Sequence, residues 1–172
     1  MSSYNLKRLL QPKSIALFGG FWIENVANQI KNSNFKGNVW PVNPHRKSIA
    51  GYKCFQDISD LPGVPDTAFI GVNRTKTLEI LTKLNEVGCG GATCFAAGFS
   101  EVDKYGKQLQ KKLSKASKDM PFLGPNCYGY INYLDHIYMW PDQHGGKEVE
   151  KGVAIIAQSS NIAINLTMNT RS

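Results

Sequence analysis

The chain has 172 residues, 42% of them hydrophobic, and a formal net charge of +7, which fits one globular domain and excludes a disordered chain. No apolar run approaches the roughly 20 residues of a membrane span, and the N-terminus lacks the apolar core of a signal peptide. The four cysteines form no C-x-x-C pair and have no zinc-ligand spacing, so we expect reduced thiols, no metal site and a cytoplasmic location.

The first predicted elements surround a pair of glycines. Residues 6–10 carry leucines at the spacing of a short helix, and residues 15–18 form an apolar run typical of a strand buried on both faces. Gly19 and Gly20 follow, and residues 23–30 have helical apolar spacing. Glycine allows close approach of a ligand, and the N–H groups at a helix start attract phosphate. A tight turn in any α/β domain would have the same pattern, because the G-x-G-x-x-G fingerprint is incomplete.

Strand and helix patterns then alternate along the chain. A helix capped by Asn73 or Thr75 would bury Val87 among its apolar residues and end at Gly88. Residues 52–55 are a strand or a loop, and one helical turn fits within the connection that follows. Such alternation predicts an α/β fold with a doubly wound parallel sheet. The predicted strands cover residues 37–42, 67–72, 91–96 and 122–123, and a further helix covers residues 101–118.

The carboxyl ends of these strands carry small residues, turn formers or amides. In a parallel sheet, ligands bind beyond these ends. The residues are Gly19 and Gly20, Asn43 and Pro44, Val72 and Asn73, Ala97 and Gly98, and Gly124, Pro125 and Asn126. We therefore expect a ligand site along this edge.

The segment after the second predicted strand is basic. An NAD site would have an acidic residue here to bind the ribose hydroxyls, but residues 43–47 include no acid. This favours a ligand with a phosphorylated ribose, such as CoA or NADP, over NAD.

The lysines between residues 104 and 118 recur at helical spacing around two leucines. We interpret them as a solvated helix face rather than as a nucleic-acid site, and a basic surface would also suit a polyanionic small ligand. The residues are Lys107, Lys111, Lys115 and Lys118, around Leu109 and Leu113.

The pattern changes in the last third of the chain. Residues 130–143 lose their period and suggest an aromatic-rich crossing segment, in which His136 and the nearby His144 are interpreted as polar loop residues rather than metal ligands. After a glycine-rich break, residues 152–157 are predicted to form a buried strand and residues 162–166 to begin a helix. One such unit cannot bury its own faces, so we expect the start of a truncated second domain.

Short motifs follow one another in a characteristic order over nearly the whole chain. They are Leu10-Gln-Pro-Lys-Ser-Ile-Ala, Gly37-Asn-Val-Trp-Pro-Val-Asn-Pro44, Ile49-Ala-Gly51, Leu61-Pro62 with Pro65-Asp66, Gly98-Phe99-Ser-Glu101, Leu123-Gly-Pro-Asn-Cys127 with Gly129, and residues 153–160. This order resembles the CoA-binding domain of NDP-forming acyl-CoA synthetases. That group includes the α-subunit of succinyl-CoA synthetase and ADP-forming acetate–CoA ligase. The resemblance implies a Rossmann-like CoA-binding domain over residues 1–144 and the start of a flavodoxin-like ligase domain over residues 145–172.

The resemblance also implies how CoA or acyl-CoA would lie, with no catalytic or metal-binding residue in this chain. In this arrangement Gly19, Gly20 and Phe21 would face the pyrophosphate. Asn43, Pro44 and Arg46 or Lys47 would lie near the adenosine 3′-phosphate. Val72, Asn73, Ala97 and Gly98 would flank the adenine and pantetheine, and Asn126 and Cys127 would lie toward the thiol. Cys127 could be a nucleophile, but no histidine is placed to activate it, so we interpret it as a packing residue.

Two turns depart from the family. The first glycine turn is Gly19-Gly-Phe-Trp22 instead of Gly-Ala-Ser, and the later turn is Ala157-Gln-Ser-Ser160 instead of Ser-Gln-Ser-Gly. In the family the later turn helps hold a phosphohistidine, and none of the histidines at positions 45, 136 and 144 matches that residue.

Three functions remain open at this point. The first is the CoA-binding part of an acid–thiol ligase, inactive alone and working with further ligase domains or a β-type ATP-grasp subunit. The second is a non-catalytic CoA-sensing module, for example one fused to a lysine acetyltransferase, which the altered later turn slightly favours. The third is an NADP-binding oxidoreductase domain, although no hydride-handling residue stands out.

Overall fold

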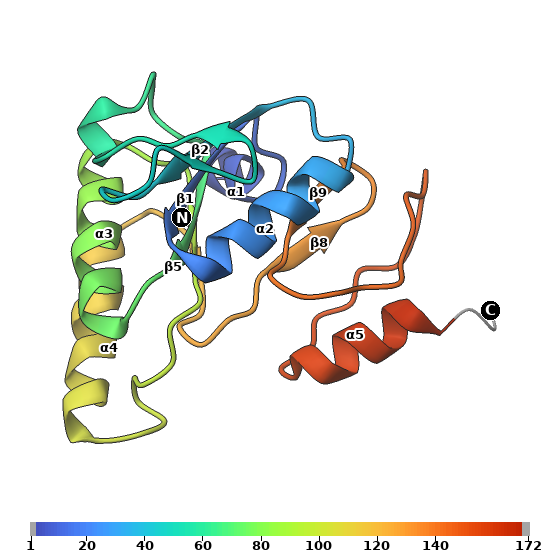
Figure 1. The fold of residues 1–172 in the computed structure, drawn as a ribbon. Coiled ribbons are helices and arrows are strands. Elements are labelled where there is room, and N and C mark those ends of the chain that lie inside the picture. The colour runs from blue at the N-terminus through green and yellow to red at the C-terminus, as the bar shows by residue number, and fades with distance from the viewer. Residues whose placement is uncertain (1–2, 170–172) are drawn as a thin grey trace.

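The apolar runs of the sequence form the centre of one parallel sheet (Figure 1). The computed structural model describes residues 3–169. The sheet has five strands in the order β2-β1-β5-β6-β7, all parallel. The strands are β1 (Ser14–Gly19), β2 (Asn38–Val42), β5 (Thr67–Gly71), β6 (Ala92–Cys94) and β7 (Phe122–Leu123). The predicted α/β class with a Rossmann-like parallel sheet is confirmed.

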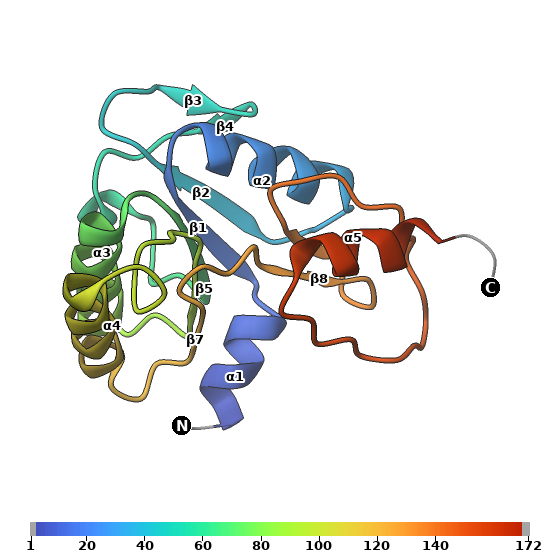
Figure 2. The same ribbon diagram turned by 90° about the horizontal axis from the view of Figure 1, so that it is seen from below.

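Helices cover both faces of the sheet (Figures 1 and 2). Helices α3 (Arg74–Glu86) and α4 (Lys104–Ser117) pack side by side on one face, and α2 (Phe21–Asn32) packs on the other. The alternation of side chains along β1 divides the core between them. Ala16 and Phe18 pack on the α3–α4 side, whereas Ile15 and Leu17 pack on the α2 side.

Several small elements complete the domain. Helix α1 (Ser3–Leu10) contacts β5. Strands β3 (Ser48–Ile49) and β4 (Tyr52–Lys53) form a small hairpin, followed by the single 3₁₀ turn η1 (Ile58–Asp60). The short first helix and the helical turn agree with the sequence predictions, and the segment left open as a strand or a loop begins with a strand at Tyr52–Lys53.

A second hairpin was not expected from the sequence. Residues in the aromatic-rich segment form the antiparallel strands β8 (Tyr130–Asn132) and β9 (Ile137–Met139). Ile137 and Met139 are buried against α2 and the sheet. The hairpin therefore packs beside α2 on the same face of the sheet.

Two details of the predicted helices are wrong. Val87 is 41% exposed because it is the C-cap of α3 and lies beyond the last buried turn. Helix α4 begins at Lys104 rather than at Glu101, because the Asp103 side chain caps it by accepting from the Gly106 N–H.

The predicted buried strand over residues 152–157 is also wrong. These residues form no strand, and the side chains of Val153 and Ile156 are 90% and 100% exposed. Helix α5 (Ser160–Met168) follows as predicted, although none of its residues is buried. The physical reason is that a parallel strand needs a neighbour for its backbone groups, and the described part of the chain provides none here. Residues 170–172 of the predicted second unit lie outside the described residues.

Candidate functional site

The carboxyl ends of β1 and β5 form the topological switch point of the sheet. From β1 the chain crosses to β2 on one side and later returns to β5 on the other side, which leaves a crevice at the carboxyl edge. Gly19 and Gly71 end these two strands and face each other in the parallel register. Gly19 has a φ of +142°, and a Cβ on it would lie 2.5 Å from the Gly71 carbonyl oxygen. The close approach of the two backbones therefore requires glycine at position 19.

A cavity of about 380 Å³ opens at this edge, which is within the usual range for ligand sites. It lies between the β1–α2 turn, the loop after β2, the loop before η1 and one face of α3. The aliphatic and aromatic part of its lining comprises Phe18, Val42, Ile58, Val72 and Ile80. Polar and charged groups occupy the rest of the wall, so the cavity combines an apolar slot with a charged rim.

The cavity contains several of the predicted site residues. Gly19, Gly20, Asn43, Pro44 and Val72 all line it. The Asn43 side chain also ties two of the loops together, because its Nδ2 donates to the Gly19 carbonyl oxygen at 2.6 Å. The turn after β1 and the turn after β2 are therefore held in a fixed relation across the opening.

Phe21, Arg46, Lys47 and Asn73 were also predicted at the site, but they are not among the residues that line this cavity. Phe21 is 67% exposed in the first turn of α2. Arg46 forms an ion pair with Glu24 at 2.6 Å, and Lys47 is exposed in the same loop. Asn73 is the N-cap of α3 and accepts from the Lys76 N–H at 3.0 Å.

Ala97 and Gly98 form the next loop along the edge. The Arg74 guanidinium donates to the Gly98 carbonyl oxygen, and the Gly98 N–H donates to the Glu101 carboxylate at 2.7 Å. The Arg74 guanidinium also stacks on the Tyr105 ring, with 5.0 Å between them. The loop is therefore held by α3 and α4 rather than open to the cavity.

Asn126 and Cys127 follow β7 and contact the end of β6. Their N–H groups donate to the Ala96 and Cys94 carbonyl oxygens at 2.9 and 3.2 Å. Burial raises the pKa of the Cys127 thiol, and burial together with the neighbouring Cys127 raises the pKa of Cys94 to about 12. Because the thiolate is the reactive form, these cysteines lack the features of an activated nucleophile.

The cavity also includes residues that the sequence did not indicate. Gln56 and Asp57 reach it because the segment after β4 pairs with the end of β2, with Phe55 N–H donating to the Pro41 carbonyl oxygen at 2.9 Å. This contact between separate segments leaves no local signal. Lys76, Glu79 and Lys83 line it from α3, and their helical spacing could have been recognised as one face of that helix.

Asp57 and Lys83, which both line the cavity, neutralise each other's charge. The Lys83 ammonium lies 3.1 Å from the Asp57 carboxylate. The Ser59 N–H and then Lys83 lower the pKa of Asp57, so that this carboxylate remains ionised. The ion pair therefore joins α3 to the loop before η1 and contributes little net charge.

Aromatic rings continue along the same edge of the sheet on the α2 side. Trp22 contacts Phe95 with 4.8 Å between ring centroids, Phe95 contacts Tyr128 at 5.5 Å, and Tyr128 contacts Trp140 at 5.2 Å. Trp22 is still 38% exposed. The bulky turn after β1 is therefore supported by packing and does not fill the cavity.

Two further observations concern the described residues. Within residues 3–169, no helix has the length and apolar character needed to cross a bilayer. In the same part of the chain, no three His, Cys, Asp or Glu residues gather in a way that could hold a metal ion.

The strand order defines a Rossmann-like α/β domain, and the cavity lies at its topological switch point. A family model for a CoA binding domain matches residues 13–133. The chain therefore belongs to the CoA-binding domain family, and the family resemblance predicted from the motifs is confirmed.

The chain is also similar to parts of longer enzymes. Trans-feruloyl-CoA synthase from an unknown prokaryotic organism is 30% identical, over 94% of this chain and 24% of that protein. The ADP-forming acetate–CoA ligase of Methanocaldococcus jannaschii is 32% identical, over 92% of this chain and 23% of the ligase. The chain thus spans about a quarter of the length of these curated relatives.

A solved structure of a longer protein also contains a part that this chain matches. It is the dinucleotide forming acetyl-coenzyme A synthetase 1 of Ca. Korarchaeum cryptofilum, in complex with phosphate and ADP. The TM-score is 0.82 and the identity 29%, over 94% of this chain and 36% of that chain. Nearly the whole length of the present domain is therefore matched by one part of a larger synthetase.

Proposed function

We propose that this chain binds CoA in the cavity at the switch point and serves as the CoA-binding part of an NDP-forming acyl-CoA synthetase. The observation that carries this proposal is the meeting of Gly19, Gly20, Asn43, Pro44 and Val72 around one cavity. These residues come from three separate strand ends, and each was expected at the CoA site from the family resemblance. Membership of the CoA-binding domain family supports the same ligand.

In this proposal the parts of CoA lie along the carboxyl edge. The glycine turn would bind the pyrophosphate through its backbone N–H groups, and the apolar wall would hold the adenine. Val72, Asn73, Ala97 and Gly98 would flank the adenine and pantetheine, and Asn126 and Cys127 would lie toward the thiol. Phe21 would face the pyrophosphate with the glycine turn, and Asn43, Pro44 and Arg46 or Lys47 would lie near the adenosine 3′-phosphate.

We further propose that residues 145–172 begin a second ligase domain, which follows a CoA-binding domain over residues 1–144. Exposed apolar side chains between Val153 and Ile156, and a helix without buried residues, support this division. The proposed partners are further ligase domains or a β-type ATP-grasp subunit, which would supply the phosphohistidine chemistry. Free cysteines at all four positions fit a cytoplasmic location.

A non-catalytic CoA-sensing module is the second candidate function. The turn at residues 157–160 favours it, because the glycine of the ligase motif is replaced there by Ser160. Ser159 is the N-cap of α5 but makes no capping hydrogen bond through its side chain. The reading frame after the codon for Ser172 separates the two functions, since it would encode either a ligase domain with the histidine or an acetyltransferase domain.

Calorimetric titration with CoA tests the ligand. We expect one CoA per chain, with NADP and NAD competing weakly. Absence of CoA binding in a sample that is folded by circular dichroism would overturn the proposal. Preferential binding of NADP would support an oxidoreductase domain instead.

A further inference from the structure

The carboxyl edge of the sheet carries a row of aromatic rings on the side of α2. The rings belong to Trp22, Phe95 and Tyr128, which we call the aromatic strip. They come from the first turn of α2, the residue after β6 and the segment after β7. Their consecutive centroids lie 4.8 and 5.5 Å apart, within the range of favourable ring packing. The strip is therefore one continuous apolar surface built from three separate segments.

Packing against the core fixes the strip, while one end of it stays open to solvent. Phe95 contacts the fully buried ring of Phe69, with 5.8 Å between the centroids. Trp22 is 38% exposed, and Phe21 packs edge-on against it at 5.4 Å and is 67% exposed. A ligand ring that covers Trp22 would bury apolar surface on both partners. Because Trp22 is already held by its neighbours, such binding would cost little side-chain ordering.

The strip passes the place that the proposed function gives to the CoA thiol. Tyr128 follows Cys127 directly in the sequence. The Cys127 N–H donates to the carbonyl oxygen of Cys94, the residue before Phe95. Two rings of the strip therefore flank the contact between these two cysteines. An acyl group joined to a CoA sulfur at this position would lie beside the strip.

The strip also has a definite chemical character, because none of its side chains is charged. Glu24, two residues after Trp22, is neutralised by Arg46 at 2.6 Å. A carboxylate brought against uncharged rings would lose hydration without gaining a counter-ion. An aromatic ring would gain both burial and ring–ring contact. The strip therefore suits an uncharged aromatic group better than a small or an anionic one.

We propose that the aromatic strip binds the acyl group of an aromatic acyl-CoA, and that Trp22 makes the domain prefer such a group to acetyl or succinyl. This inference rests on the proposed function, because it requires CoA bound with its thiol toward Cys127. The acyl ring stacks on the exposed part of Trp22, and Phe95 and Tyr128 hold that surface in place. The corresponding acid substrate is an aromatic carboxylic acid.

Calorimetric titration of the chain with CoA, acetyl-CoA, succinyl-CoA and benzoyl-CoA tests this inference. We expect wild type to bind benzoyl-CoA about tenfold more tightly than acetyl-CoA, and succinyl-CoA no more tightly than acetyl-CoA. Trp22→Ala should remove the preference for benzoyl-CoA and leave the affinity for free CoA within about twofold of wild type. Trp22→Phe should keep most of the preference, because it keeps a ring. Leu134→Ala is the control, since Leu134 is 53% exposed in the turn of the β8–β9 hairpin, outside the strip.

The ratio of the affinities for benzoyl-CoA and acetyl-CoA separates a contact with the acyl ring from a general effect on the CoA site. Equal affinities in a wild type that binds CoA would overturn the inference and leave the proposed function standing, as expected if another domain packs on the strip. A preference that persists in Trp22→Ala, or that is lost in Leu134→Ala, would overturn it as well. A folded wild type that binds none of the four ligands would overturn both the inference and the proposed function.

Discussion

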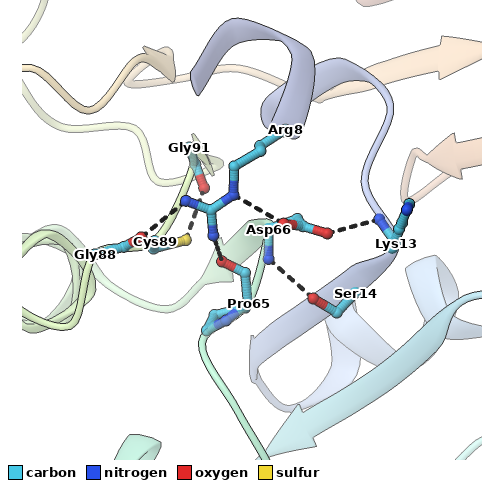
Figure 3. Close-up of polar contacts among 8 residues, drawn as sticks. All are labelled: Arg8, Lys13, Ser14, Pro65, Asp66, Gly88, Cys89 and Gly91. Carbon is cyan, nitrogen blue, oxygen red and sulfur yellow. Dashed lines mark hydrogen bonds and ion pairs between the residues drawn. The ribbon is translucent and has the colours of Figure 1, made fainter. Parts of the chain in front are cut away.

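Arg8 Nε lies 2.8 Å from Asp66 Oδ1, and this ion pair joins α1 to the start of β5 (Figure 3). The other carboxylate oxygen accepts from the Lys13 N–H at 2.8 Å, and the Asp66 N–H donates to Ser14 Oγ at 3.0 Å. The pair is largely buried, with 16% of the Arg8 side chain and 22% of the Asp66 side chain exposed. One acidic residue thus connects the first helix, the first strand and β5.

The same arginine also donates hydrogen bonds to two loops at the amino edge of the sheet. Its remaining nitrogens donate to the Gly88 and Pro65 carbonyl oxygens at 2.9 and 3.0 Å (Figure 3). Pro65 and Asp66 belong to one of the motifs by which the family is recognised, yet they lie at the edge opposite the cavity. Their role in this chain is therefore structural.

Replacement of Asp66 by asparagine should destabilise the domain. The substitution keeps the shape of the side chain but leaves Arg8 without its counter-ion, and we expect a loss of about 2 kcal/mol in the free energy of unfolding. Urea denaturation measures this loss. Asp119→Asn, at an exposed position, is the control and should change stability by less than about 0.5 kcal/mol. Equal stability of the two variants would contradict a structural role for the ion pair.

The same residue predicts a pH dependence. Burial would raise the pKa of Asp66, but hydrogen bonds from Arg8 and the Lys13 N–H outweigh burial and hold it below its usual value. The unfolded chain therefore binds this proton more readily than the folded chain. Its contribution to stability is present above about pH 4 and is lost as the pH falls through the folded pKa. Asp66→Asn should flatten the stability profile in this acidic range, and an unchanged profile would refute the assignment.

The glycine turn offers a prediction with a control one residue away. Gly19→Ala places a Cβ 2.5 Å from the Gly71 carbonyl oxygen and forces an L-residue to a φ of +142°, so we expect a loss of at least about 2 kcal/mol. Gly20 has a φ of −128° and nothing within 4 Å of the added Cβ, so Gly20→Ala should cost less than about 1 kcal/mol. Thermal unfolding of both variants tests the difference. Similar melting temperatures would contradict the close approach of β1 and β5.

The parallel sheet and the position of the glycine turn could be predicted from the sequence because both depend on local patterns. Continuous apolar runs such as residues 15–18 indicate strands buried on two faces, and turn residues mark their ends. The carboxyl edge follows from this alternation once the sheet is taken as parallel. For this reason the sequence alone could place Gly19, Asn43 and Val72 at one site.

The remaining part of the site depends on contacts between distant segments. Asp57 reaches the cavity only because the loop after β4 pairs with the end of β2, and no local pattern predicts this pairing. The charge of Arg46 was visible in the sequence, but its neutralisation by Glu24 across two elements was not. The strand predicted over residues 152–157 failed for a related reason, since an apolar run indicates a strand only where a partner strand exists.

Paired isoleucine substitutions test the exposure of that segment. Ile156 is fully exposed, so Ile156→Ala should change the free energy of unfolding by less than about 0.5 kcal/mol. Ile70 is fully buried in β5, and Ile70→Ala should cost about 2–5 kcal/mol. The comparison uses the same chemical change at both positions, measured by urea denaturation. A large loss in Ile156→Ala would show that the segment packs in solution.

Cys127 allows a chemical test of where the CoA thiol lies. It is partly exposed, whereas the other three cysteines are buried, and burial raises its pKa, so its reaction with a small disulfide should be slow. If CoA binds with its thiol toward β7, the mixed disulfide of CoA with pyridine-2-thiol places its sulfur beside this residue. Attack by the Cys127 thiolate would form a protein–CoA disulfide and release pyridine-2-thione. We expect this reagent to modify Cys127 at least about tenfold faster than the corresponding cysteamine disulfide, because binding raises the local concentration.

Controls for this labelling distinguish the position of the bound CoA thiol from the intrinsic reactivity of Cys127. Cys127→Ser should abolish the fast phase, and free CoA in excess should slow it to the rate of the cysteamine reagent. Mass spectrometry identifies the modified residue and measures its occupancy. Equal rates for the two reagents in a protein that binds CoA would place the thiol away from Cys127, and fast labelling of Cys94 would place it deeper, beside β6.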